Sequence, residues 1–210
     1  MTKILIVDDH EVVRRGLKQI LADEFKPSKV GEARTASEAL DIAGRESWDV
    51  VLLDITMPGR NGLEALEDFR RLHPKTAVLV LSASPEEDYA LRALKLGAAG
   101  YLTKQSASDE LLAAVRKALA GGKYVTASLA EKLVASLSSD APSAPHETLS
   151  NRELQVLRFI ATGKTLKEIA AELSLSEKTI GTYRTRIAEK MNLHTNVELT
   201  RYALQHHLVE

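Results

Sequence analysis

Short apolar runs alternate with amphipathic stretches along the first 120 residues of the chain. The most apolar run, at residues 50–53, has four consecutive aliphatic side chains and predicts a strand buried on both faces. Further strands are predicted at residues 4–7, 29–33, 77–81 and 100–103. Helical spacing or capping residues predict helices at about 11–22, 35–46, 63–70, from 84 onward and 108–120. Repeated strand–helix units of this kind indicate a parallel sheet with helices on both faces, an α/β doubly wound fold.

The second part of the chain has a purely helical pattern. Residues 138–145 are rich in Ser, Ala and Pro, a composition that predicts a linker. Beyond it, helices are predicted at about 150–162, 165–173, 177–192 and 196–205, and the short helix, tight turn and longer helix over 165–192 have a helix-turn-helix shape. We therefore expect one domain at 1–121, a connecting segment with a short helix near 128–138 at 122–147, and a small all-α domain at 148–210.

Composition narrows the class of protein. The chain has no cysteine, which excludes a disulfide framework, a thiolate zinc site and a cysteine nucleophile. It has no apolar run of roughly 18 residues and no signal-peptide pattern at its start, so we expect a cytoplasmic protein without a membrane partner. The net charge is −1, but residues 148–210 carry a net charge of +2, which mildly favours an anionic partner for that part.

Polar side chains follow the predicted strands at the points where the strands end. Asp8 and Asp9 follow the first strand, Asp54 ends the third, Ser82 the fourth and Lys104 the fifth. Carboxyl ends of parallel strands share one edge of the sheet, which is where such folds bind ligands. Clustered carboxylates favour Mg²⁺, and a lysine beside them can offset the charge of a phosphoryl group. This set of residues suits phosphorylation of a carboxylate, with Asp54 as the nucleophile.

The strand-end residues lie within longer motifs. These motifs are Asp8-Asp9-His10 with Arg14 and Gly16-Leu17, Asp54-Ile55-Thr56-Met57-Pro58 with Gly62-Leu63, and Gly97-Ala98-Ala99-Gly100-Tyr101-Leu102-Thr103-Lys104. Together they resemble the receiver domain of NarL/FixJ-family response regulators, over about residues 2–120. The resemblance implies a flavodoxin-like receiver with a five-stranded parallel sheet.

The resemblance also implies a role for each residue of the cluster. Asp54 would be the phosphoacceptor, and Asp9, Asp54 and the backbone carbonyl of Thr56 would bind Mg²⁺. Asp8 would act on the metal mostly through water. Ser82 would be the switch hydroxyl, Tyr101 the switch aromatic and Lys104 the phosphate-binding lysine.

Residues 148–208 resemble the LuxR-type helix-turn-helix of the same family, a four-helix domain. The matching residues include Leu149-Ser150, Arg152-Glu153, Lys167-Glu168-Ile169-Ala170, Lys178-Thr179-Ile180 and Lys190-Met191-Asn192-Leu193. The resemblance implies that the helix at 177–192 enters the major groove of double-stranded DNA. The predicted DNA-contact residues are Lys178, Thr179, Gly181, Thr182, Arg184, Thr185, Arg186 and Lys190.

Different roles are expected within this helix. Gly181, Thr182 and Thr185 match base-reading positions, and since glycine has no side chain, direct readout should depend on the two threonines. The cationic side chains Lys178, Arg184, Arg186 and Lys190 are predicted to bind phosphates. Ile180, Ile187 and Met191 share another face of the helix and should pack in the core.

These observations predict a two-component response regulator rather than an enzyme. A sensor histidine kinase would phosphorylate Asp54, which would promote homodimerisation and sequence-specific DNA binding to regulate transcription. Val197, Ala203 and Leu204 in the last helix are candidates for the contact between DNA-bound copies.

Two alternatives are less well supported. The first is a doubly wound magnesium phosphatase or phosphotransferase. Such enzymes commonly carry a second acid two residues after the nucleophile, and the Thr56 at that position in this chain disfavours them. A constitutive DNA-binding protein with a receiver-like dimerisation module would usually have lost Asp9, Asp54 or Lys104, and all are present.

Overall fold

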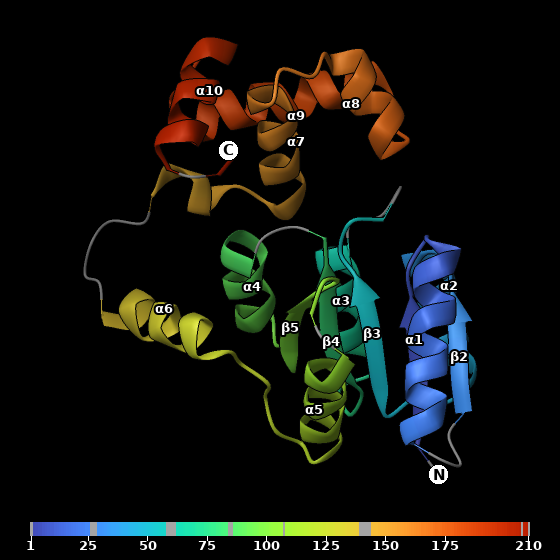
Figure 1. Ribbon diagram of the computed structural model, residues 1–210. Helices are drawn as coiled ribbons and strands as arrows, with labels where there is room; N and C mark the ends of the chain where they lie inside the picture. The colour runs from blue at the N-terminus through green and yellow to red at the C-terminus, as the bar shows by residue number, and fades with distance from the viewer. Residues whose placement is uncertain are drawn as a thin grey trace. The chain divides into compact units, whose positions relative to one another are not determined.

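The computed structural model describes residues 2–25, 29–57, 62–83, 86–106, 108–138, 144–206 and 208–209. The chain divides into two compact units, Met1–Ser139 and Asp140–Glu210 (Figure 1). Within the described ranges, every helix is too short or too polar to cross a lipid bilayer.

The first unit is built on a parallel five-stranded sheet with the strand order β2-β1-β3-β4-β5. Its strands are β1 (Lys3–Val7), β2 (Lys29–Ala33), β3 (Val50–Asp54), β4 (Ala77–Ser82) and β5 (Gly100–Thr103). The helices between and after them are α1 (Glu11–Glu24), α2 (Ala36–Arg45), α3 (Gly62–Leu72), α4 (Glu86–Lys95) and α5 (Ser108–Leu119). The predicted α/β fold is thereby confirmed, although the predicted start of α4 at residue 84 lies outside the described residues.

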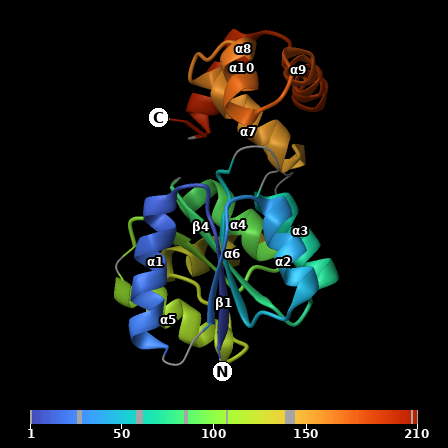
Figure 2. The same cartoon turned by 90° about the vertical axis from the view of Figure 1, so that its right-hand side faces the viewer.

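Alternate residues of each strand face opposite sides of the sheet. In β3, Val51 and Leu53 pack with residues of α2, α3 and α4, while Val50 and Leu52 pack with residues of α1 and α5. Figure 2 shows α1 and α5 on one side of the strands and α2 and α3 on the other. Both faces are covered, which explains why the strands are continuous apolar runs rather than alternating patterns.

Residues 122–138 pack on the first unit. Tyr124 forms a bridge with Gly100, and a Cβ at Gly100 would lie only 2.7 Å from the Tyr124 carbonyl oxygen. The predicted short helix is present as α6 (Ala127–Ser138), and its Leu129 is buried in the same core as α4. The compact unit therefore extends to Ser139, beyond the predicted domain limit at 121, because α6 has an apolar face to bury. The predicted linker at 138–145 lies mostly outside the described residues.

The second unit is helical, as predicted. It comprises a 3₁₀ turn, η1 (Pro145–Thr148), and the helices α7 (Asn151–Ala161), α8 (Leu166–Leu173), α9 (Glu177–Met191) and α10 (Asn196–Gln205). Capping boxes that begin at Ser150, Thr165 and Thr195 satisfy backbone N–H groups at the starts of α7, α8 and α10. Ile180, Ile187 and Met191 of α9 are buried in the core of this unit, as the helical spacing predicts.

Candidate functional site

The ends of three strands bring the polar residues of the first unit together. Asp8 follows β1, Asp54 ends β3 and Lys104 follows β5, and the two carboxylates are fully buried. The boundary between β1 and β3 is where the strand order reverses, the position at which open parallel sheets form a ligand-binding crevice.

Lys104 connects two of the strand ends. Its Nζ lies 2.8 Å from Oδ2 of Asp54 and 2.7 Å from Oδ2 of Asp8. Burial would lower the pKa of Lys104, but its hydrogen bonds with Asp54 and Asp8 outweigh that effect and raise it. Burial raises the pKa of Asp54, and the hydrogen bond from Lys104 only partly opposes this. The pocket therefore holds the protonated ammonium of Lys104 beside the Asp54 carboxylate, whose cost of burial is only partly offset by that ammonium.

The second oxygen of Asp54 is held by the chain that follows it. The backbone N–H of Thr56 donates to Oδ1 of Asp54 at 2.8 Å. At the start of α3, Gly62 lies against this turn, and a Cβ there would be 2.4 Å from both the Asp54 carbonyl oxygen and Ile55 Cα. Only glycine allows α3 to begin so close to the end of β3.

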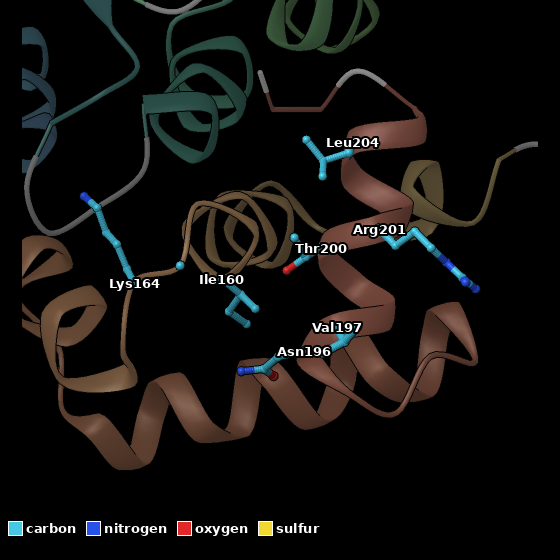
Figure 3. Close-up of a pocket in the computed structure, with 8 residues that line it drawn as sticks. Ile160, Lys164, Asn196, Val197, Thr200, Arg201 and Leu204 are labelled. Atoms are coloured by element: carbon cyan, nitrogen blue, oxygen red, sulfur yellow. The ribbon is translucent and has the colours of Figure 1, made fainter.

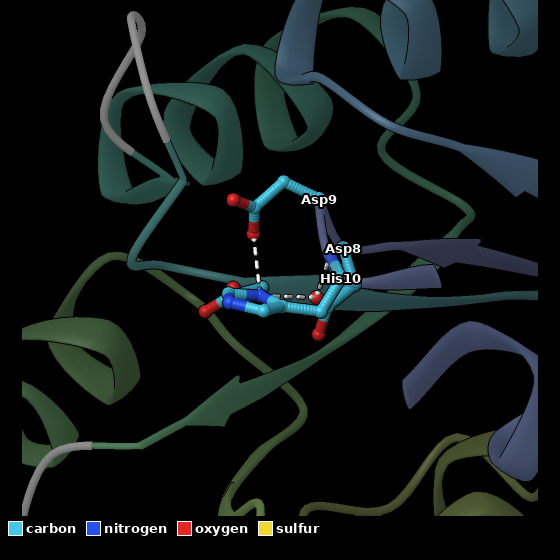
Figure 4. A group of neighbouring side chains, drawn as sticks. Asp8, Asp9 and His10 are labelled. Atoms are coloured by element: carbon cyan, nitrogen blue, oxygen red, sulfur yellow. Dashed lines mark hydrogen bonds and ion pairs between the residues drawn. The ribbon is translucent and has the colours of Figure 1, made fainter. Parts of the chain in front are cut away.

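Asp8, Asp9 and His10 form a small cluster after β1 (Figure 4). The His10 backbone N–H donates to Oδ1 of Asp8 at 2.8 Å, and His10 Nδ1 lies 2.8 Å from Oδ1 of Asp9. One ligand atom from each of Asp8, Asp9, His10 and Asp54 lies within 4.8 Å of the other three. Carboxylate oxygens gathered in this way fit a hard divalent cation.

In the second unit, α8, a turn and α9 have the predicted helix-turn-helix arrangement. Lys178, Thr182, Thr185 and Arg186 are exposed on α9. The hydroxyl of Thr182 donates to the Lys178 carbonyl at 3.0 Å, and that of Thr185 donates to the Gly181 carbonyl at 3.1 Å. Because both hydroxyl protons are used in hydrogen bonds within α9, the two threonines present oxygen lone pairs and methyl groups to another molecule.

Two of the cationic residues of α9 make contacts inside their own unit. Arg184 Nε donates to Oδ1 of Asn196 at 2.8 Å and so ties α9 to the start of α10. Lys190 Nζ donates to Oε2 of the buried Glu153 at 2.6 Å and ties α9 to α7. Hydrogen bonding between separate helices could not be inferred from spacing within α9 alone.

The geometry agrees with comparisons to known families. Residues 4–116 match the response regulator receiver domain, and residues 147–203 match the bacterial regulatory proteins of the luxR family. The chain belongs to the response-regulator family. Its two matched parts are a receiver domain and a LuxR-type DNA-binding domain, as the motifs predicted.

Similar proteins share this organisation over the whole chain. Response regulator UvrY of Escherichia coli K12 is 37% identical over 209 residues, which cover 99% of this chain and 96% of UvrY. Response regulator GacA of Pseudomonas aeruginosa is 37% identical over 211 residues, 100% of this chain and 99% of GacA. RcsB from Salmonella enterica serovar Typhimurium, solved bound to promoter rprA with phosphomimetic BeF₃⁻, is 25% identical with a TM-score of 0.63, covering 96% and 98% of the two chains.

The two predicted switch residues of this response regulator lie near the end of the sheet. Ser82 is buried at the end of β4, and its carbonyl accepts a hydrogen bond from the Lys104 N–H at 2.7 Å. Tyr101, in β5, has no exposed surface and packs in the core that α2, α3 and α4 cover. The Tyr101 ring therefore lies inside the first unit in this structure.

Sequence reasoning treated His10 and Arg14 of this response regulator only as parts of a motif. In the structure, Arg14 is buried and donates from Nη1 to the Asp8 carbonyl at 2.7 Å, so it supports the acidic cluster from α1. The sequence contained a feature that could have pointed to each of these two residues as part of the site. Arg14 is a charged residue next to the apolar stripe of α1, and His10 directly follows the two aspartates.

An open groove of about 420 Å³ runs along α10 of the response regulator (Figure 3). It is lined by Ile160, Gly163, Lys164, Asn196, Val197, Thr200, Arg201 and Leu204. Val197 is 77% exposed and Leu204 is 49% exposed, so both are available to another molecule. Ala203 is fully buried in the core of its own unit, so its predicted part in a contact between copies is wrong. The helical turn directs Ala203 to a different side of α10 from Val197 and Leu204.

Proposed function

We propose that this response regulator is phosphorylated on Asp54 by a sensor histidine kinase. The observation that supports this most is the meeting of Lys104 with Asp54 and Asp8 in one buried pocket. A carboxylate oxygen of Asp54 attacks the phosphorus of a phosphohistidine, the P–N bond breaks, and the imidazole leaves with the bonding electrons. Lys104 then offsets the negative charge that arrives with the phosphoryl group.

The cation of this pocket is Mg²⁺ in our proposal, bound by Asp9, Asp54 and the backbone carbonyl of Thr56. Asp8 acts on it mostly through water. The donor set supports this, because Mg²⁺ is usually held by one or two carboxylates together with waters and phosphate oxygens. Mg²⁺ supplies the positive charge that lets an anionic phosphodonor enter a pocket containing several carboxylates.

Phosphorylation shifts an existing equilibrium between two conformations. Ser82 and Lys104 bind the phosphoryl group and thereby favour the conformation with Tyr101 inside. The burial of Tyr101 supports this, because the receiver fold already accommodates the ring in its interior, so the conformation with Tyr101 inside needs no new fold. The favoured conformation forms a homodimer.

The dimer binds double-stranded DNA with α9 in the major groove and regulates transcription. Lys178, Thr179 and Arg186 contact the backbone, and Thr182 and Thr185 contact base edges. Arg184 and Lys190 already contact Asn196 and Glu153, so any phosphate contact that they make is shared with those partners. RcsB, a similar protein, has been solved on a promoter, which supports this part of the proposal. The groove that holds Val197 and Leu204 is our candidate for the contact between DNA-bound copies.

We propose functional limits of 1–121 for the receiver domain, 122–147 for the connecting segment and 148–210 for the DNA-binding domain. In this division α6 belongs to the connecting segment, although its Leu129 packs in the core of the receiver. The proposed location is the cytoplasm, where chromosomal DNA and the kinase domain can both be reached.

Intact-mass measurement after incubation with acetyl phosphate tests the proposal. The wild-type protein should gain one phosphoryl group in Mg²⁺ and none after chelation with EDTA. Asp54→Ala should gain none in either condition. Labelling that is unchanged in Asp54→Ala or in EDTA would refute the assignment.

A further inference from the structure

We propose that α6 docks on the receiver in a switch-dependent manner, so that phosphorylation of Asp54 shortens the tether to the DNA-binding domain. This inference rests on the proposed function for its signal and adds the step by which that signal leaves the receiver. With α6 docked, the tether to η1 consists of residues 139–144, which can span at most roughly 20–25 Å. With α6 released, all of residues 122–144 belong to the tether. Tether length sets how readily two joined domains reach a shared target.

The segment before α6 is fixed to the sheet at Tyr124. The Tyr124 N–H donates to the Ala99 carbonyl at 2.7 Å, and Tyr124 forms a parallel bridge with Gly100 at the start of β5, an edge strand of the sheet. The Tyr124 hydroxyl donates to Oε1 of Glu110 on α5 at 3.2 Å. These contacts join Tyr124 to β5 and α5 rather than to α4. We therefore expect Tyr124 to stay in place while the helix that follows it docks or leaves.

The docking of α6 depends mainly on one buried side chain. Leu129 is 1% exposed and shares a core with Ala93 and Leu94 of α4, and Leu133 packs against the same core while partly exposed. Val134, on another side of α6, is 63% exposed. A helix of 12 residues such as α6 is marginal in water by itself, so we expect it to be stable only while docked. Burial of one leucine side chain is enough to change the docking equilibrium about tenfold or more.

Helix α4 connects α6 to the predicted switch aromatic. It contacts both β5 and α6, and Tyr101 of β5 lies in the same core as Leu129. Burial and the neighbouring Tyr101 raise the pKa of Tyr89, on α4, to about 12, which shows that the two phenols lie close together. Because this core is close-packed, departure of Tyr101 would leave a void that α4 must move to fill. The surface that accepts Leu129 moves with α4, so docking of α6 and the inward position of Tyr101 favour each other.

Hydrogen–deuterium exchange on the full-length protein distinguishes switch-dependent docking from permanent docking. After treatment with acetyl phosphate and Mg²⁺, the amides of α6 should exchange at least about tenfold more slowly than before, in protein whose intact mass shows the added phosphoryl group. Leu129→Ala should accept the phosphoryl group but lose this protection. Val134→Ala, which shortens an exposed apolar side chain of the same helix, is the matched control and should keep it. Equal exchange in β3 of all three proteins checks that the receiver stays folded.

A distance measurement gives a second, independent test. The chain has no cysteine, so Lys75→Cys and Val134→Cys would introduce the only two thiols for spin labels. With unlabelled protein in excess, the distance distribution between the labels should be broad before phosphorylation and narrow after it. Phosphorylated protein in which neither the exchange of α6 nor this distribution has changed would overturn the inference and leave the proposed function intact. Wild-type protein that gains no phosphoryl group would instead refute the proposed function and, with it, the signal for docking.

Discussion

Nζ of Lys104 lies 2.8 Å from Oδ2 of Asp54, and the same ammonium lies 2.7 Å from Oδ2 of Asp8. One cation therefore serves two buried carboxylates that follow different strands. A phosphoryl group on Asp54 would replace the carboxylate charge of that residue and compete with Asp8 for this ammonium, because its oxygens carry more negative charge. Movement of Lys104 from the carboxylates to the phosphoryl group is therefore a natural first event of the switch.

Replacement of Lys104 by Ala should leave Asp54 phosphorylatable but prevent dimer formation, since the phosphoryl group would lose its partner in the receiver. Light scattering on the acetyl-phosphate-treated protein measures the mass of the assembly. Lys75→Ala, which removes an exposed lysine just before β4, is the matched control and should dimerise normally. Full dimer formation by phosphorylated Lys104→Ala would contradict the role assigned to the lysine.

Asp54→Asn should raise the thermal stability of the metal-free protein near neutral pH. Burial raises the pKa of Asp54 above its unfolded value, so ionisation of this carboxyl costs folding free energy once the pH exceeds the unfolded pKa. The amide keeps the shape and removes the charge. Mg²⁺ should raise the melting temperature of wild type more than that of Asp54→Asn. Scanning calorimetry in Mg²⁺ and in EDTA checks both expectations, and equal Mg²⁺ effects in the two proteins would count against Asp54 as a ligand.

Gly62→Ala should destabilise the receiver by about 1–3 kcal/mol, because the new Cβ would lie 2.4 Å from the main chain at Asp54 and Ile55. The same displacement should slow labelling of Asp54 by acetyl phosphate. Gly16→Ala is the control: it lies within α1 with open space around its Cβ position, and it should stabilise by about 0.5–1 kcal/mol. Denaturant titration gives both values, and a neutral Gly62→Ala would show that α3 does not need this close approach.

Lys190→Met should make the DNA-binding unit more sensitive to acid. Burial would raise the pKa of Glu153, but hydrogen bonds from Lys190 and Ser150 lower it below its ordinary value of 4.5. The stabilisation is thus present above the unfolded pKa and is lost as the pH falls through the lower folded pKa. Without Lys190 the midpoint of acid unfolding should move to higher pH, as circular dichroism would record. Arg186→Met, an exposed change on the same helix, should leave the midpoint where it is.

Thr182→Ala should change which bases are preferred, whereas Arg186→Ala should weaken binding to every sequence. A threonine cannot make a bidentate contact, so discrimination per base should be at or below about 1 kcal/mol. Loss of one phosphate contact should reduce the salt slope by about 1. Selection from random DNA compares sequence preferences, and identical preferences for wild type and Thr182→Ala would exclude base reading by Thr182. A single unpaired half-site would contradict binding as a dimer.

The sequence alone determined the features that depend on local spacing. Apolar runs such as residues 50–53 specify buried strands, and the capping box at Ser150 and Glu153 marks a helix start, because both signals come from residues a few positions apart. Since parallel strands end at one edge, the same patterns also placed Asp8, Asp54 and Lys104 near one another. The motifs around these residues identified the family.

Only the tertiary structure decided which partners those side chains take. The ammonium of Lys104 is shared by Asp8 and Asp54 because the sheet order places β1 beside β3 and β4 between β3 and β5, an order that local periodicity does not encode. Arg184 and Lys190 look like free cations within α9, yet packing brings Asn196 and Glu153 to them from other helices. Contacts between residues far apart in sequence are set by competition among all the partners that folding brings together, and no local pattern records the outcome of that competition.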